Sequence, residues 1–122
     1  MKRIGILSVA ALMIGAQCLP AFATPAAPSA TAIVGADGTL VGGNGVASAA
    51  RTATGVYTVT FTAADVPTAC AYTASIGTQA LVPPRIGLVN VGAGDTAGTI
   101  RVYTYDNHVQ AADRPFQVYV AC

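Results

Sequence analysis

Side chains suited to acid–base or nucleophilic chemistry are scarce in this chain of 122 residues. His108 is the single histidine, and it lies two positions after Asp106. A histidine oriented by a carboxylate can act as a general base in hydrolysis. A catalytic triad also needs a nucleophile, and no serine after residue 23 lies in a nucleophile-elbow motif. We therefore interpret His108 as a solvated loop residue and keep a small hydrolase that uses Asp106 and His108 as an alternative.

The carboxylates of the chain are all aspartates and number five: Asp37, Asp65, Asp95, Asp106 and Asp113. A suitably spaced pair could hydrolyse a glycosidic bond. Each, however, stands in a segment expected to form a turn or loop, where aspartate commonly stabilises turn geometry. The segment 92–98 around Asp95 has the glycines of a calcium-binding repeat, but such repeats act in stacked copies and this one occurs once. We assign no catalytic residue; a pair of loop aspartates remains part of the hydrolase alternative.

The first 23 residues have the three parts of a secretory signal peptide. Lys2 and Arg3 precede an uncharged apolar run over 4–14, and Ala21-Phe22-Ala23 provides small residues for cleavage. The run is shorter than the roughly 20 residues of a transmembrane helix. We expect a signal peptide at 1–23, export to the periplasm or the extracellular space, and no membrane anchor after cleavage. An uncleaved N-terminal anchor is the alternative.

Cleavage would remove Cys18 and leave two cysteines, Cys70 and Cys122. Two cysteines in an exported chain predict one disulfide, with a pair of free buried thiols as the alternative. The bond would stabilise the domain by about 4 kcal/mol in the chain-entropy model. Two cysteines and one histidine cannot fill the four positions of a structural zinc site. We expect no metal and no cofactor.

The chain after residue 23 has an almost balanced charge. Four arginines and five aspartates give it a net charge of −1, and it contains no lysine. This composition excludes a basic surface for nucleic acid and a polybasic membrane patch. Its apolar content argues against intrinsic disorder. We expect a Pro/Ala-rich spacer over 24–31 and a single folded domain over 32–122.

Valine and threonine dominate this domain, and glycines interrupt it frequently, which favours strands over helices. Apolar and polar residues alternate most clearly over 55–62 and 115–122. Further strands are predicted over 32–34, 39–41, 46–51, 70–75, 86–91 and 99–105. About eight short strands with frequent turns predict an all-β fold, namely an antiparallel β-sandwich or a jelly-roll-like arrangement with one disulfide.

A possible binding face follows from the same alternation. Arg101, Tyr103 and Tyr105 fall on the outer face of one strand, and Tyr119 points outward on another. Tyrosine and arginine are the residues most enriched at binding hot spots. The face could bind a glycan, a protein partner or a second copy of the chain. The alternative is ordinary packing, with the tyrosine hydroxyls at the rim.

Four segments form a recognisable pattern: Asp37-Gly-Thr-Leu40, Gly55-Val-Tyr-Thr-Val-Thr-Phe61, Cys70-Ala-Tyr72, and the closing strand that runs from Asp113-Arg-Pro-Phe116 to Cys122. Together they resemble a group of small exported bacterial proteins and C-terminal β-modules, over residues 31–122. The resemblance implies the fold and the disulfide, and it implies no activity. The strand over 55–61 is also similar to one in phage tail-fibre and collagen-tail head domains, which are trimeric β-sandwiches.

These observations favour an exported β-sandwich that acts as a non-catalytic interaction or structural module. The small hydrolase described above and a secreted inhibitor are the alternatives.

Overall fold

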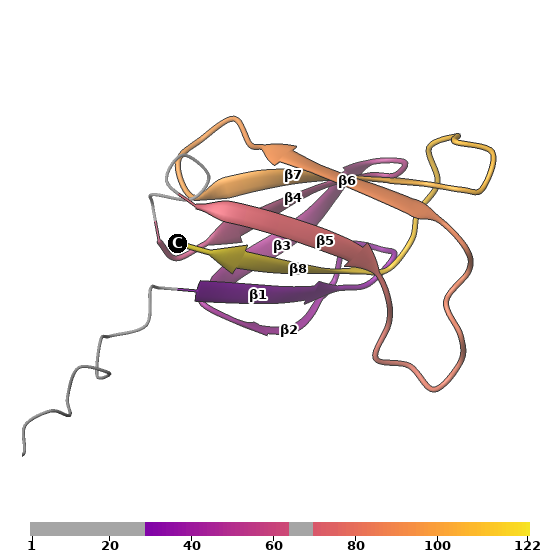
Figure 1. Ribbon diagram of the computed structural model, residues 1–122, viewed down its shortest axis with the longest axis horizontal. Helices are drawn as coiled ribbons and strands as arrows, with labels where there is room; N and C mark the ends of the chain where they lie inside the picture. Colours follow the sequence, from indigo (N-terminus) through magenta and orange to yellow (C-terminus); the bar gives the residue numbers. More distant parts are fainter. Residues whose placement is uncertain (1–28, 64–69) are drawn as a thin grey trace, which may run out of the picture.

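A computed structural model describes residues 29–63 and 70–122 and folds them into eight strands without a helix (Figure 1). The strands are β1 (Ser29–Val34), β2 (Leu40–Asn44), β3 (Val46–Ala53), β4 (Val56–Phe61), β5 (Ala71–Ile76), β6 (Leu88–Ala93), β7 (Thr99–Tyr105) and β8 (Phe116–Ala121). The expected signal peptide and Asp65 lie outside the described residues. Within the two described ranges, no helix is long and apolar enough to cross a membrane.

The strands form two antiparallel sheets of four. Sheet A has the order β2-β1-β8-β5, and sheet B has the order β3-β4-β7-β6. The hairpins β1–β2, β3–β4 and β6–β7 each stay within one sheet, while the remaining connections cross between the sheets. The fold is therefore a β-sandwich, and the expected all-β class is confirmed.

The core lies between the two sheets and is built by alternation along the strands. On β4, Tyr57, Val59 and Phe61 point inward and are buried. The ring of Tyr57 meets the ring of Phe116 from β8 edge to face, with centroids 4.9 Å apart. Because side chains alternate between the two faces of a strand, the residues between the buried ones must point to the outside of the sandwich.

Most predicted strand boundaries differ from the structure by up to three residues, as where the strand predicted over 39–41 continues to Asn44, and two of the differences bear on the domain and on its loops. The first strand begins at Ser29, so the last three residues of the expected 24–31 spacer belong to the domain. They do so because β1 pairs with β8 from Ser29 opposite Ala121 onward, and Ala30 is already buried. The strand expected over 86–91 runs from Leu88 to Ala93 instead, since its pairing with β7 starts at Leu88.

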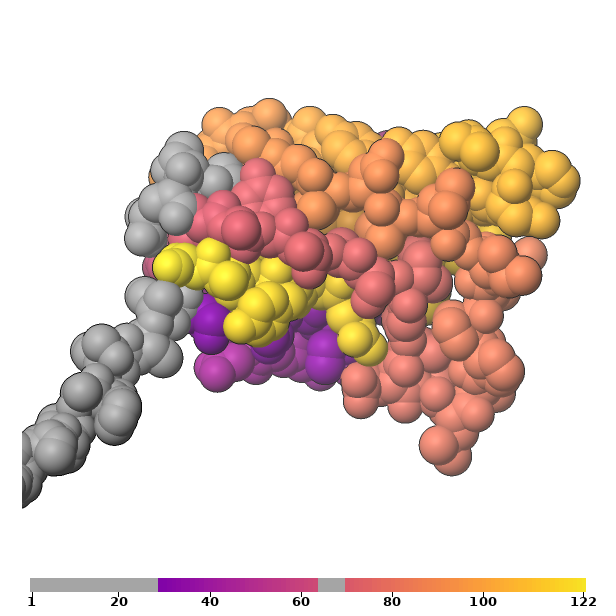
Figure 2. All heavy atoms as spheres, viewed as in Figure 1, coloured from indigo at the N-terminus to yellow at the C-terminus, as the bar shows by residue number. Residues whose placement is uncertain are grey.

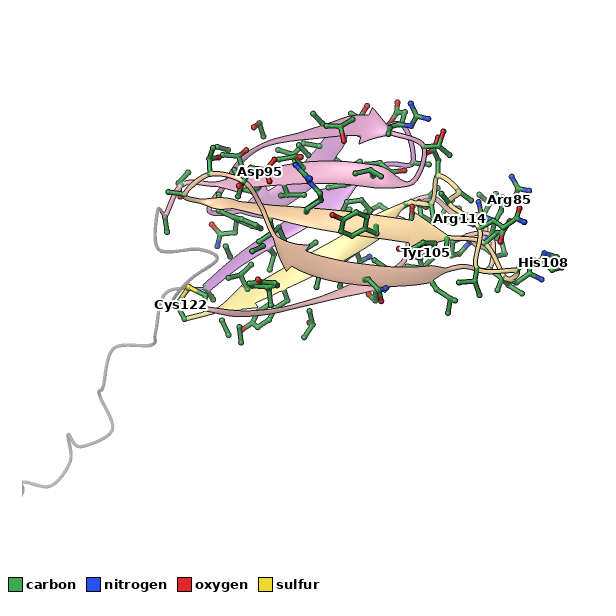
Figure 3. All side chains as sticks on the ribbon, turned by 90° about the horizontal axis from the view of Figure 1, so that it is seen from above. Arg85, Asp95, Tyr105, His108, Arg114 and Cys122 are labelled. Carbon is green, nitrogen blue, oxygen red and sulfur yellow. A yellow bond between two sulfur atoms is a disulfide. The ribbon has the colours of Figure 1, made fainter. Side chains whose placement is uncertain are left out.

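The predicted disulfide between Cys70 and Cys122 is confirmed. It joins the residue before β5 to the residue after β8, and these two strands are neighbours in sheet A. The bond therefore braces one side of that sheet at the C-terminus of the chain, at the end of the molecule where Figure 3 labels Cys122. A disulfide is compatible with an oxidising environment.

Candidate functional site

The structure divides the predicted Tyr/Arg face between the two sides of the sandwich. Arg101, Tyr103 and Tyr105 lie on β7 of sheet B, whereas Tyr119 lies on β8 of sheet A. Both strands turn their alternate residues into the common core, so their remaining side chains point in opposite directions. The expectation of one face formed by these four residues is corrected to two separate outer faces.

The outer face of sheet B holds its arginine in an ion pair. The guanidinium of Arg101 donates to the carboxylate of Asp95, which lies in the β6–β7 hairpin loop. This hydrogen bond is the main reason that the pKa of Arg101 is raised. Register places Thr58 and Gly92 on either side of Arg101, in the neighbouring strands. The side chains of Tyr103 and Tyr105 are half-buried, so this face offers little free aromatic surface.

The outer face of sheet A contains a depression of about 390 Å³ that crosses β1, β8 and β5. We call it the sheet A groove and define it by six outward-facing residues in two rows: Thr31, Tyr119 and Thr73, then Ile33, Gln117 and Ser75. Tyr119 is 52% exposed in it. Of the residues that the structure describes, none that lines the groove is charged. The volume of the groove lies within the range of about 300–1,000 Å³ that is typical of small-ligand pockets.

The chemistry of the groove is that of a neutral hydrogen-bonding surface. Hydroxyl groups and the Gln117 amide can each donate or accept, while Ile33 and the Tyr119 ring supply apolar contact area. Sequence reasoning found Tyr119 but missed its neighbours, although alternation in the strands over 32–34 and 70–75 already turns Ile33, Thr73 and Ser75 outward. Their convergence depends on which strands pair, and local alternation does not specify strand pairing.

Asp113 joins three loops at one end of the sandwich. One carboxylate oxygen accepts from the Gly55 N–H at 2.7 Å, and the other accepts from Arg51 Nε at 2.9 Å. The Tyr57 hydroxyl lies 3.4 Å from the first oxygen and donates to the Ala36 carbonyl at 2.7 Å. The hydrogen bond from Arg51 is the main reason that the pKa of Asp113 is lowered. The pKa of Tyr57 is raised, mainly because its hydroxyl is partly buried. Asp113 is a structural anchor that the sequence identified only as a loop residue.

The carboxylate of Asp106 makes its hydrogen bonds within its own loop. It accepts from the backbone N–H groups of His108 at 2.8 Å and Gln110 at 3.0 Å, and these bonds lower its pKa. His108 is exposed at the tip of the β7–β8 loop, at the opposite end of the molecule from Asp95 (Figure 3). Among the described residues, no cluster of three or more His, Cys, Asp or Glu could hold a metal ion.

Comparison with known protein families, curated protein sequences and solved structures found no match to this chain. The resemblances to small exported bacterial modules and to tail-fibre head domains therefore stay predictions.

Proposed function

We propose that the protein is an exported, non-catalytic interaction module that binds an uncharged polypeptide segment in the sheet A groove. One observation carries this proposal: an uncharged depression surrounds a tyrosine that is 52% exposed, on the outside of a well-packed sandwich. Tyrosine provides a large rigid contact area at low cost in side-chain entropy, so an exposed one in a hollow suits recognition.

The composition of the groove favours a polypeptide over a carbohydrate. Ile33 and Tyr119 offer apolar area to a side chain, and Gln117 offers an amide that can donate to a backbone carbonyl. An extended peptide presents both kinds of group along its length. A neutral glycan would stack on Tyr119 but has little to bury against the methyl groups of Ile33.

The secretory leader and the disulfide support export as part of the proposal. The environment of the acids supports a non-catalytic role. Asp106 and Asp37 accept hydrogen bonds from backbone N–H groups of their own turns, and Asp113 and Asp95 are paired with arginines. Each of these carboxylates therefore has a structural partner that catalysis would have to displace.

The test is selection of short random peptides without charged residues on the disulfide-intact protein, with a neutral glycan array in parallel. We expect peptides to be captured, and Tyr119→Ala to weaken their binding by at least about tenfold, as loss of a hot-spot aromatic does. Tyr103→Ala removes the same ring from the opposite outer face and should leave binding unchanged.

Capture of glycans alone would show that the ligand is a carbohydrate and that the proposed polypeptide ligand is wrong. Peptide binding that is unaffected by Tyr119→Ala, or an absence of binding in both screens, would contradict the proposal.

A further inference from the structure

The connection between β5 and β6, residues 77–87, carries apolar side chains into solvent. Leu81 is fully exposed, Val82 is 66% exposed and Ile86 is 76% exposed. Figure 2 shows this segment, in salmon at the lower right, protruding beyond the strands of sheet A. Large aliphatic side chains gathered on one protrusion mark an interaction site more often than isolated exposed ones do.

The base of this loop is fastened to the sandwich. Gly77 N–H donates to the Pro115 carbonyl at 3.1 Å, and the Ile86 carbonyl accepts from Arg114 Nε at 2.9 Å. Arg114 is itself buried and also donates to the Asp113 carbonyl. Both ends of the loop are therefore held against the β7–β8 connection, and its tip is presented from a fixed base. A segment positioned in this way loses less entropy on binding than a free one.

The chemistry of the tip is complementary to that of the sheet A groove. Residues 78–84 contain no charge and include Leu81, Val82, Pro83 and Pro84. The two prolines have no backbone N–H, so their peptide groups can only accept hydrogen bonds. Within the described residues, no carbonyl from 79 to 85 accepts one. The groove offers donors in Gln117 and its hydroxyls, and it offers Tyr119, the type of ring against which proline-rich segments pack.

Within one copy, the loop does not fill the groove, because the described residues that line the groove include none from the loop. Neither carries charge apart from Arg85 at the foot of the loop, so their contact buries no unpaired ion. Resting on the proposed function of the groove, we propose that its ligand is the 78–84 loop of a second copy of this chain. The contact can be reciprocated about a two-fold axis, which produces a dimer, or repeated head-to-tail, which produces an open chain or a closed ring.

A contact between loop and groove makes a sharp prediction about two complementary variants. Leu81→Asp places a charge on the fully exposed loop tip, and Thr73→Arg fills the groove from an exposed strand position. By analytical ultracentrifugation, the wild-type protein should form dimers or larger species as its concentration rises, and each variant alone should stay monomeric. A mixture of the two should form a dimer and stop there, because one intact loop meets one intact groove.

One control variant and one further groove variant accompany this experiment. Val109→Asp changes another exposed aliphatic residue in a neighbouring loop and should assemble like the wild type. Tyr119→Ala is a second groove variant, and it should weaken self-association by at least about tenfold. Circular dichroism and an intact disulfide confirm that each variant is folded.

A wild-type protein that stays monomeric up to millimolar concentration overturns the inference, as does a variant mixture that fails to dimerise. Leu81-dependent binding of a monomer to phospholipid vesicles would assign the loop to a lipid surface and also overturn it. The proposed function fails separately: if monomers still capture neutral peptides through Tyr119, the groove binds polypeptide and only the identity of its partner is wrong.

Discussion

The two outer faces of this sandwich are built from the same kind of strand but differ in what they leave available. On sheet B, Arg101 is paired with Asp95, and its neighbours Tyr103 and Tyr105 are half-buried. On sheet A, Tyr119 stands in an uncharged depression and is 52% exposed. The composition of a strand does not decide whether its tyrosines are free to bind.

The difference comes from the neighbouring strands. Tyr119 lies between Thr31 and Thr73, two short side chains that leave room around its ring. Tyr103 lies between Val56 and Asn90, and Leu88 stands beside Tyr105. Val56 is no larger than a threonine, but Asn90 and Leu88 are larger and cover more of the rings beside them, so the rings of sheet B contribute to the packing of that face. Changes at the disulfide, at Asp113 and at Asp95 should separate the roles of the two faces, with effects that decrease in that order.

Removal of the disulfide should affect the groove face more than the opposite face. The double change Cys70→Ser with Cys122→Ser should lower the free energy of unfolding by about 4 kcal/mol, since the bond closes a long loop. Because the bond links β5 to β8, hydrogen exchange should accelerate first in those strands. Equal acceleration in β6 and β7 would show that the bond braces both sheets alike. Chemical denaturation of wild type and variant measures the loss of stability.

Asp113→Asn should destabilise both faces together, because Asp113 joins loops from both sheets. The loss of its charge-assisted hydrogen bond from Arg51 should cost about 1–2 kcal/mol at neutral pH. In the wild type the folded-state pKa of Asp113 is lowered, so its stabilisation is complete above the ordinary pKa of an aspartate and is lost as pH falls through the folded-state value.

Urea denaturation from pH 7 down to about pH 2 tests this account, over the range in which aspartates titrate. The asparagine variant should lose less stability on acidification than the wild type. Equal acid sensitivity of the two proteins would mean that Asp113 contributes nothing to the pH dependence. Tyr119-dependent binding at neutral pH should be the same in both.

Asp95→Asn should have the smallest effect. The ion pair with Arg101 is solvent-exposed, and pairs of this kind contribute little to stability, and less at high salt. The free energy of unfolding of the variant should be slightly lower than that of the wild type in low salt and equal to it in high salt. Binding in the groove should not change, since the pair lies on the other face. Loss of binding in this variant would transfer the function to sheet B.

Much of the fold can be predicted from local pattern. Alternation identifies the inward faces of β4 and β8, and the strand expected over 99–105 has the boundaries that the structure shows. The Asp37-Gly38 turn is evident from its residues, and Asp37 accepts from the Thr39 N–H as expected of such a turn. The disulfide follows from the cysteine count.

The features that local pattern does not predict depend on contacts between residues far apart in the sequence. Tyr119 acquires its groove only because β8 lies between β1 and β5, and alternation does not say which sheet a strand joins. For the same reason, alternation alone cannot separate the four residues of the predicted face. The anchoring role of Asp113 depends on Arg51, which is 62 positions away. The apolar residues after Ile86 predict a strand that includes it, and the structure places Ile86 in the protruding loop.

The most direct test of the central claim is an NMR titration of the isotope-labelled protein with a neutral peptide from the selection. Amide shifts should concentrate in β1, β5 and β8 around Tyr119, and the amides of β6 and β7 around Tyr103 should stay in place. Shifts centred on Arg101 and Tyr103 would show that the binding surface is the outer face of sheet B, and would contradict this account.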